Sequence, residues 1–169
     1  MDIQKVDQQA LVPVEEKEAS FDLLVVFRLI DQEYGLMASC VREIIRNRNR
    51  TRVPNASRFI DGVINLRGRI VPVFNMRRRL GLEEEEVGRR DECTIMVVES
   101  EDNDAGLVVD RVADVVKIDD TSIDRTVSQI KGLMGSQFIA GTVDLNGRLV
   151  TMLKLEPLLE SEIATGGES

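Results

Sequence analysis

Residues 59–71 read FIDGVINLRGRIV and residues 138–150 read FIAGTVDLNGRLV, so seven of thirteen positions are identical at an offset of 79. A second match lies upstream, where residues 35–45 align with residues 106–116 at an offset of 71. Two matches in the same order, separated by one insertion, indicate an internal duplication. The sequence therefore predicts two related halves that meet near residues 80–93.

Each half contains short runs rich in Val, Ile, Leu and Phe that are bounded by Gly, Asn and Asp, a pattern typical of β-strands. Hairpin turns are expected at Gln32-Glu33-Tyr34, Arg67-Gly68 and Asn146-Gly147, and Asn-Gly is the strongest two-residue signal. Five short strands in each half favour a small barrel, so we expect an all-β fold with two five-stranded β-barrel subdomains. The expected strands are 23–30, 34–39, 41–46, 59–65, 69–75, 93–99, 105–110, 111–118, 138–143 and 148–154.

Helix is expected only as short pieces in the linker and near the C-terminus, where Pro157 is suited to the first turn of a helix. Pro72 lies inside an apolar run, which predicts an edge strand or a bulge. Residues 1–20 mix Asp, Glu, Gln and Lys without an apolar stretch, and disordered tails are predicted at both ends. The expected boundaries are a tail at 1–20, a domain at 21–160 with subdomains at about 21–82 and 92–155, a helix at 156–164 and a tail at 165–169.

The composition argues against catalysis. Histidine is absent from the chain, which removes the commonest general acid–base group and the commonest transition-metal ligand. No phosphate-binding loop or nucleophile elbow occurs, and Cys40 and Cys93 are interpreted as small core residues. We therefore predict a protein that is not an enzyme and that has no catalytic residues, no metal and no cofactor. No apolar run reaches the roughly 18 residues that span a bilayer, so we expect a cytoplasmic protein without membrane insertion.

Charge is unevenly distributed along the chain. Residues 42–79 hold eleven Arg against Glu43 and Asp61, a balance of +9 within a chain whose net charge is −8. One alternative is therefore a small β-barrel that binds nucleic acid through the Arg-rich segments 46–52 and 77–79. The acidic net charge and the scarcity of aromatic residues argue against it. Our hypothesis for the basic loop is that exposed Arg48 and Arg50 accelerate association with an acidic protein partner.

The motifs of both halves resemble the CheW family of chemotaxis coupling proteins over about residues 21–160. The resemblance rests on Tyr34-Gly35, Val41-Arg42-Glu43-Ile44, Val53-Pro54-Asn55-Ala56, the stretch 59–68, Val71-Pro72-Val73 and the stretch 106–112. It implies two SH3-like five-stranded barrels that share a core. It also implies a non-catalytic adaptor at receptor arrays under the membrane. The implied partners are the cytoplasmic tip of a chemoreceptor and the regulatory domain of a CheA-type histidine kinase, with other CheW-like proteins as further candidates.

The resemblance also identifies candidate residues for partner binding. The family's paired acidic and arginine positions fall on Glu43 and Arg67, whose counterparts in the second half are Asp114 and Asn146. Only the first half therefore retains an Arg that can close this ion pair. Flat apolar positions and glycines that allow close backbone approach complete the set. The partner-binding candidates are Glu43, Arg67, Val41, Gly62, Asn65, Leu66, Gly68, Gly106, Val112 and Gly141.

Overall fold

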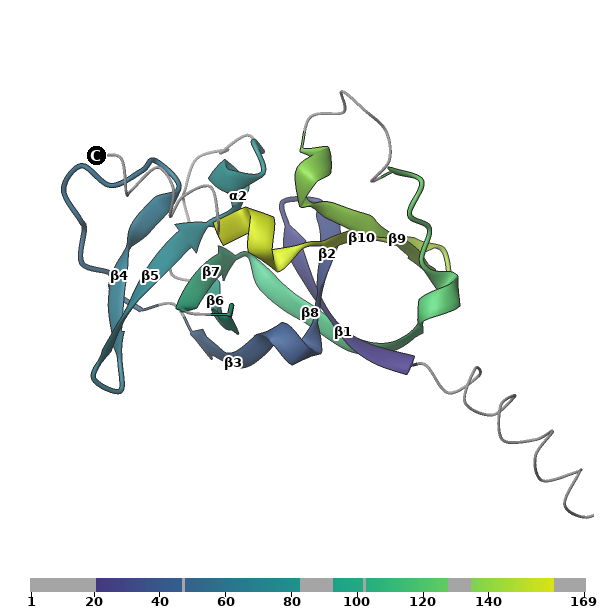
Figure 1. Cartoon of the computed structure of the whole chain (residues 1–169), viewed down its shortest axis with the longest axis horizontal. Helices are drawn as coiled ribbons and strands as arrows, with labels where there is room; N and C mark the ends of the chain where they lie inside the picture. Colours follow the sequence, from purple (N-terminus) through teal and green to yellow (C-terminus); the bar gives the residue numbers. More distant parts are fainter. Residues whose placement is uncertain (1–20, 47, 83–92, 102, 128–134, 160–169) are drawn as a thin grey trace, which may run out of the picture.

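The structure is a computed structural model that describes residues 21–46, 48–82, 93–101, 103–127 and 135–159. Within these ranges the chain folds into two five-stranded sheets, each curled into a barrel, which lie side by side in Figure 1. The tails at 1–20 and 165–169, the acidic run at 83–86 and the end of the predicted C-terminal helix lie outside the described residues.

Ten strands form the two sheets, and each expected strand is present within two residues of its predicted bounds. This confirms the all-β class. The strands are β1 (Phe21–Leu29), β2 (Gln32–Met37), β3 (Val41–Arg46), β4 (Ile60–Leu66), β5 (Arg69–Asn75), β6 (Thr94–Glu99), β7 (Asp104–Val109), β8 (Arg111–Asp119), β9 (Ile139–Leu145) and β10 (Arg148–Leu153).

The sheets do not follow the boundary expected from the repeat. One sheet has the order β8-β1-β2-β10-β9 and the other β3-β6-β7-β5-β4, so each takes strands from both halves. The split into contiguous subdomains at about 21–82 and 92–155 therefore does not describe the barrels. Each half instead contributes its first two strands to the sheet that contains the last three strands of the other half. In the repeat, β1–β5 correspond to β6–β10, and replacing each strand by its equivalent converts one sheet order into the other.

The repeat is visible in the strand register. Met152 in β10 lies opposite Gly35 in β2, and at the repeat offsets Val73 in β5 lies opposite Gly106 in β7. Isolated bridges then connect the outermost strands β4 and β9 to the segments that follow β3 and β8, at Thr51–Val63 and Asp124–Thr142. The duplication thus reproduces the pairing that closes each barrel.

Alternation along the strands produces three apolar clusters. In β1, Leu24 and Val26 belong to a cluster within one barrel, while Val25, Phe27 and Leu29 belong to a larger cluster shared by both sheets. A third cluster, which includes Ile64 and Val71, fills the other barrel. Strands that are buried on both faces explain the continuous apolar runs in the sequence.

Several local expectations need adjustment. Pro72 lies in β5, which is flanked by β7 and β4, so the edge-strand alternative was wrong. The register of the β4–β5 pair does shift, as at a bulge, but between Ile60 and Gly62 in β4. A short helix α2 (Met76–Arg79) directly follows β5 and precedes the expected linker, and residues 155–159 are helical, beginning two residues before Pro157. Cys40 and Cys93 are free thiols that are partly buried against the apolar clusters.

Candidate partner-binding site

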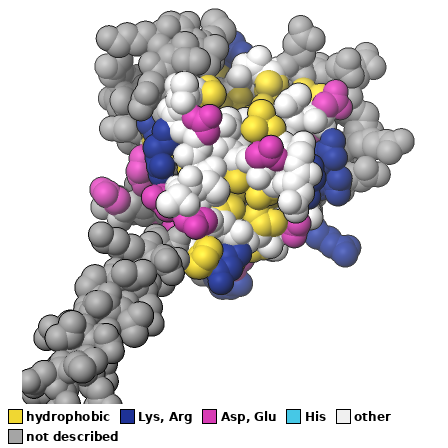
Figure 2. All heavy atoms as spheres, turned by 90° about the vertical axis from the view of Figure 1, so that its right-hand side faces the viewer, with side chains coloured by type: hydrophobic (Ala, Val, Ile, Leu, Met, Phe, Trp, Pro, Cys, Tyr) yellow, Lys and Arg dark blue, Asp and Glu magenta, His cyan; other side chains and the backbone are white. Residues whose placement is uncertain are grey.

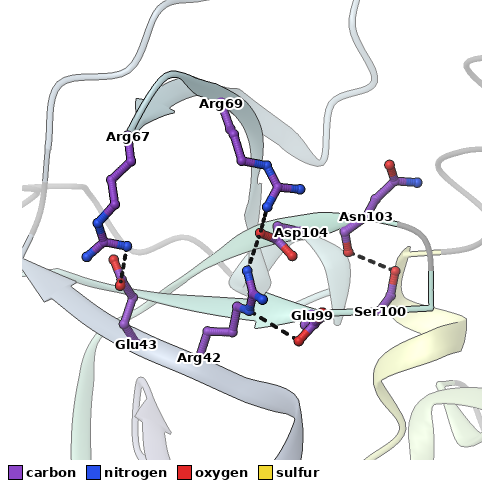
Figure 3. A network of polar contacts seen from close by, with 8 residues as sticks. All are labelled: Arg42, Glu43, Arg67, Arg69, Glu99, Ser100, Asn103 and Asp104. Carbon is purple, nitrogen blue, oxygen red and sulfur yellow. Dashed lines mark hydrogen bonds and ion pairs between the residues drawn. The ribbon is translucent and has the colours of Figure 1, made fainter.

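The predicted acidic–arginine pair forms on the barrel that contains β3 and β4. Arg67, in the turn between β4 and β5, donates from Nη1 to Oε2 of Glu43 in β3 at 2.9 Å (Figure 3). The Arg67 side chain is 76% exposed and that of Glu43 is 25% exposed. The pair therefore presents its guanidinium to solvent, where a partner can reach it.

The turn holds Arg67 in an unfavourable backbone conformation. Arg67 has a φ of 53° and Gly68 a φ of 84°, values that a two-residue hairpin turn of type I′ requires. Asn146 and Gly147 form the equivalent turn between β9 and β10 with φ of 54° and 90°. These two predicted turns are confirmed, whereas the turn expected at residues 32–34 lies at Ile30 and Asp31, because Leu29 pairs with Gln32. Asn suits the first position of a type I′ turn, whereas Arg carries the steric penalty of the left-handed region.

A second cluster of charges lies beside the pair. Arg42 contacts Glu99 and Asp104 at 3.1 Å each, and Arg69 contacts Asp104 at 3.2 Å. Figure 3 shows Arg42 and Arg69 converging on Asp104 from different strands. This surface of the barrel is therefore ordered by linked ion pairs rather than by isolated charges.

Among the described residues, the other barrel repeats only one of these interactions. Arg148 and Glu33, the repeat equivalents of Arg69 and Asp104, form a bidentate pair at 3.1 and 2.6 Å. At the positions equivalent to Glu43 and Arg67, Asp114 accepts a hydrogen bond from the Val115 backbone and Asn146 occupies the turn. The structure thus confirms that the Glu43–Arg67 pair has no equivalent in the second half.

The pair between Glu33 and Arg148 predicts a pH dependence of stability. The hydrogen bond from Arg148 lowers the pKa of Glu33 below its usual value of 4.5. A lowered carboxyl pKa contributes stability above the unfolded pKa, and this contribution is lost as the pH falls through the folded value. We expect Arg148→Gln to flatten the loss of stability as the pH falls below 4.5, measured by urea unfolding. Parallel profiles for both proteins would contradict this role for the pair.

Three predicted residues lie around Arg67. Asn65, near the end of β4, accepts a hydrogen bond on Oδ1 from the Gly68 backbone at 2.9 Å, and its carbonyl accepts one from Arg48 at 3.1 Å. Leu66 is partly buried against the apolar cluster of this barrel. A Cβ added to Gly68 would contact nothing within 4 Å. Asn65 and Gly68 therefore shape the turn that presents Arg67.

Val41 and Val112 are repeat equivalents at the starts of β3 and β8. Both are partly exposed and pack against the apolar cluster that the two sheets share. Each side chain therefore contributes to the shared core and also offers some apolar surface to a partner. Their function as partner contacts remains a prediction.

The three glycines predicted to permit close approach of a partner are buried within the fold. A Cβ on Gly62 or Gly141 would lie 2.7 Å from the carbonyl oxygen of Thr51 or Asp124. A Cβ on Gly106 would lie 2.9 Å from Ile95. The close approach that these glycines allow is therefore made by the protein's own chain, which corrects the expectation of direct partner contact.

The arginines of α2 stabilise the fold. Arg77 forms a bidentate pair with Asp110 at 2.9 and 2.6 Å, and Asp110 also accepts a hydrogen bond from the Ile30 backbone. Arg79 donates to the carbonyls of Leu158 and Pro157. These contacts argue against Arg77 and Arg79 as residues that track phosphates. The sequence offered no signal for them, because the partners are distant along the chain.

The basic loop is also less free than expected. Arg50 Nε lies 3.1 Å from Oδ2 of Asp61, and the two side chains are only 12% and 15% exposed. Arg50 is therefore not an exposed charge of the kind that accelerates association, which corrects that part of the hypothesis. Arg48 is exposed and donates to the Asn65 carbonyl.

Among the described residues, no group of three or more acidic or cysteine side chains is arranged to hold a metal ion. No helix in that part of the chain is long and apolar enough to cross a bilayer. The candidate site therefore consists of surface charges and small apolar areas.

Comparisons with known proteins agree with this architecture. Residues 23–162 match the model of the CheW-like domain. The chain is 32% identical to a chemotaxis protein CheW of Rhizobium meliloti over 82% of its length and 88% of the relative. It is 28% identical to a chemotaxis protein CheW of Treponema pallidum, with 89% of each chain covered.

A solved structure shows the same fold. The scaffolding protein TtCheW from Thermoanaerobacter tengcongensis superposes with a TM-score of 0.74 at 32% identity, covering 83% of this chain and 89% of that one. The residues that match the CheW-like domain model, 23–162, span both barrels and the hairpin that carries Arg67. The chain belongs to the CheW family and is a chemotaxis scaffold protein.

Proposed function

We propose that this protein couples the cytoplasmic tip of a chemoreceptor to the regulatory domain of a CheA-type histidine kinase, at receptor arrays under the membrane. Membership of the CheW family supports an adaptor role in chemotaxis. The candidate site consists of surface charges and small apolar areas, which suit the binding of a protein partner. In this proposal the protein acts as a rigid body that holds its partners in a fixed relative orientation.

The observation that carries the proposal is the backbone conformation of Arg67. A left-handed conformation costs a residue with a side chain about 1–2 kcal/mol, and Asn tolerates it better. Asn146 forms the same turn in the other half, so the fold does not require Arg there. An exposed ion pair returns only about 0–1 kcal/mol. Stability therefore does not account for Arg67, whereas recognition by a partner does.

Replacing Arg67 by Asn is expected to separate stability from coupling. We expect Arg67→Asn to raise the free energy of unfolding by about 0.5–1 kcal/mol, because it relieves the turn. Coupling should fall roughly tenfold, since a lost charge-assisted hydrogen bond is worth about 1.5–3 kcal/mol. The measurement is receptor-dependent autophosphorylation of the kinase, titrated with this protein.

The reciprocal variant Asn146→Arg is the matched control. It places Arg in the equivalent turn of the other half, so it should lower stability while leaving coupling unchanged. The exchange Glu43→Arg with Arg67→Glu tests the pair itself. If the exchanged protein folds and couples like the original, the pair is structural and the proposal for Arg67 is wrong.

A further inference from the structure

A basic pocket opens beside the loop that connects β3 and β4. Its volume is about 1090 Å³, and it is lined by residues 49–50, 52–58, 60–62 and Arg78. Four of the lining residues are arginines and one, Asp61, is acidic, which leaves a net charge of +3. The acidic chain thus concentrates positive charge at one concave site.

The loop that frames the pocket is fixed by backbone hydrogen bonds. Thr51 and Val63 exchange two bonds of 2.9 Å each, and Ala56 donates to the Val53 carbonyl at 3.3 Å. Asn55 has a φ of 61°, a conformation that Asn tolerates in turns. The pocket is therefore formed before any ligand binds, which limits the entropy lost on binding.

The floor of the pocket is an ion pair that the fold does not require. In the other barrel, Ile123 takes the place of Arg50, since a Cβ added to the buried glycine of each barrel would lie 2.8 Å from Ile123 and 2.9 Å from Arg50. Asp61 corresponds to Ala140 at the repeat offset, and both Ile123 and Ala140 pack against the apolar cluster of their barrel. An apolar pair, Ile123 and Ala140, thus occupies the equivalent position in the other barrel.

Retaining a largely buried ion pair where an apolar pair suffices indicates a role other than stability. Desolvation offsets most of the attraction in such pairs, and apolar replacements are often as stable or more stable. Arg78 lies 3.7 Å from the same carboxylate and donates to the Arg58 carbonyl at 3.3 Å. Asp61 therefore fixes two guanidinium groups at the base of the pocket.

Two exposed arginines, Arg52 and Arg58, lie at the rim of the pocket. Arg52 is exposed and makes no ion pair within the part of the chain that the structure describes. Arg58 is also exposed and stacks over Phe59 at 5.3 Å. Guanidinium groups bind carboxylates in bidentate geometry, so two arginines at the rim and two at the base favour a ligand with several carboxylates.

The other lining residues favour an acidic peptide over a nucleic acid as the ligand. None of the described lining residues is aromatic, so nucleic-acid bases would find no stacking surface. Val53 is 42% exposed at the edge and offers an apolar contact. The volume exceeds the roughly 300–1,000 Å³ typical of small-molecule sites and suits several residues of a peptide.

We propose that this pocket docks an extended acidic segment of a partner protein, in which Glu or Asp alternates with apolar residues. The proposal is independent of the receptor and kinase coupling described above. Within the part of the chain that the structure describes, the site belongs to one barrel, because Ile123 and Ala140 replace the Arg50–Asp61 pair in the other. Figure 2 shows the outer end of that other barrel, where acidic side chains are scattered over the face and basic ones lie mainly at its margins.

The test measures binding of a fluorescent peptide in which Glu alternates with Val, by anisotropy at low and at physiological salt. Arg52→Glu should weaken binding at least about tenfold, as expected for a lost charge-assisted contact. Arg125→Glu is the matched control, because Arg125 occupies the place of Arg52 in the other barrel. It should change the affinity by less than about twofold if the effect is local. Equal losses for both variants would overturn the proposal in favour of nonspecific attraction.

A second variant tests the base of the pocket. Arg50→Ile combined with Asp61→Ala installs the apolar pair of the other barrel, so the protein should remain folded while peptide binding weakens. If this double variant does not fold, the affinity of Arg52→Glu for the peptide still tests the proposal. Tighter binding of single-stranded oligothymidine than of the peptide would overturn the proposal. Self-association of the protein that Arg52→Glu abolishes would assign the pocket to a second copy instead.

Discussion

Gly62→Ala is expected to destabilise the protein by about 3 kcal/mol, since two separate penalties coincide at this position. Gly62 has a φ of 141°, a conformation that residues with a side chain rarely adopt. The added Cβ would also lie 2.7 Å from the Thr51 carbonyl oxygen and 2.9 Å from Arg50 Cβ. Thr51 is held by its bridge to Val63, so the backbone cannot move away without breaking the closure of the barrel.

Gly68→Ala provides the control, because it carries the backbone penalty without the clash. Gly68 has a φ of 84° and nothing lies within 4 Å of an added Cβ. We expect a loss of about 1 kcal/mol. The measurement is the midpoint of urea unfolding for both variants. Equal losses would show that strain alone governs Gly62, and a loss below about 1 kcal/mol at Gly62 would contradict the packing argument.

The strands were predictable because the duplication displays each of them twice. A run of apolar residues in one half is ambiguous by itself, but its repetition between the same turn residues fixes both its type and its bounds. Arg67-Gly68 and Asn146-Gly147 specified the hairpins for the same reason. The Glu43–Arg67 pair was predictable only through the family resemblance, since 24 residues separate its members along the chain.

The exchange of strands between the halves was not predictable from the repeat. A duplication states which strands are equivalent, but it does not state whether a strand pairs within its own half or with the other half. Both arrangements keep the same equivalences, and β1 is buried on both faces in the observed one. The choice depends on the shared core, which no local pattern describes.

The sequence also did not predict the tertiary neighbours of individual glycines and arginines. A glycine in a strand predicts close approach of another chain segment without saying which one, and at Gly106 the neighbours are Ile95 and Val73 of the same sheet. Arg50 and Arg79 lie in basic runs that read as solvated surface. Their partners are set by tertiary packing, so sequence alone could not separate them from exposed Arg52.

Arg79→Ala is the second substitution with a large expected effect, because this side chain joins the two halves. Its guanidinium lies 4.9 Å from the Phe59 ring and 4.6 Å from the Phe138 ring. These two residues open the repeated stretches, so one cation lies between equivalent aromatic rings. The same group donates to the carbonyls of Leu158 and Pro157 at 2.9 and 3.2 Å, which holds the C-terminal helical turn.

The expected loss follows from these contacts. Each cation–π contact contributes about 0.5–2 kcal/mol and each hydrogen bond to a charged group about 1.5–3 kcal/mol, and the contributions of one side chain are not additive. We expect Arg79→Ala to lower the free energy of unfolding by about 3 kcal/mol, and Arg79→Lys to lower it by about half as much. Lys retains a cation near the rings but lacks the planar fork that reaches both carbonyls.

Arg111→Ala is the matched control, because Arg111 is exposed at the start of β8 and should change stability by less than about 0.5 kcal/mol. Chemical unfolding followed by circular dichroism measures all three variants, and hydrogen exchange of the backbone at residues 155–159 localises the effect. Those amides should exchange faster in Arg79→Ala than in Arg111→Ala, since the helical turn loses its contact with α2. If exchange at residues 155–159 is unchanged, Arg79 does not couple the halves, and the shared apolar cluster alone must hold them together.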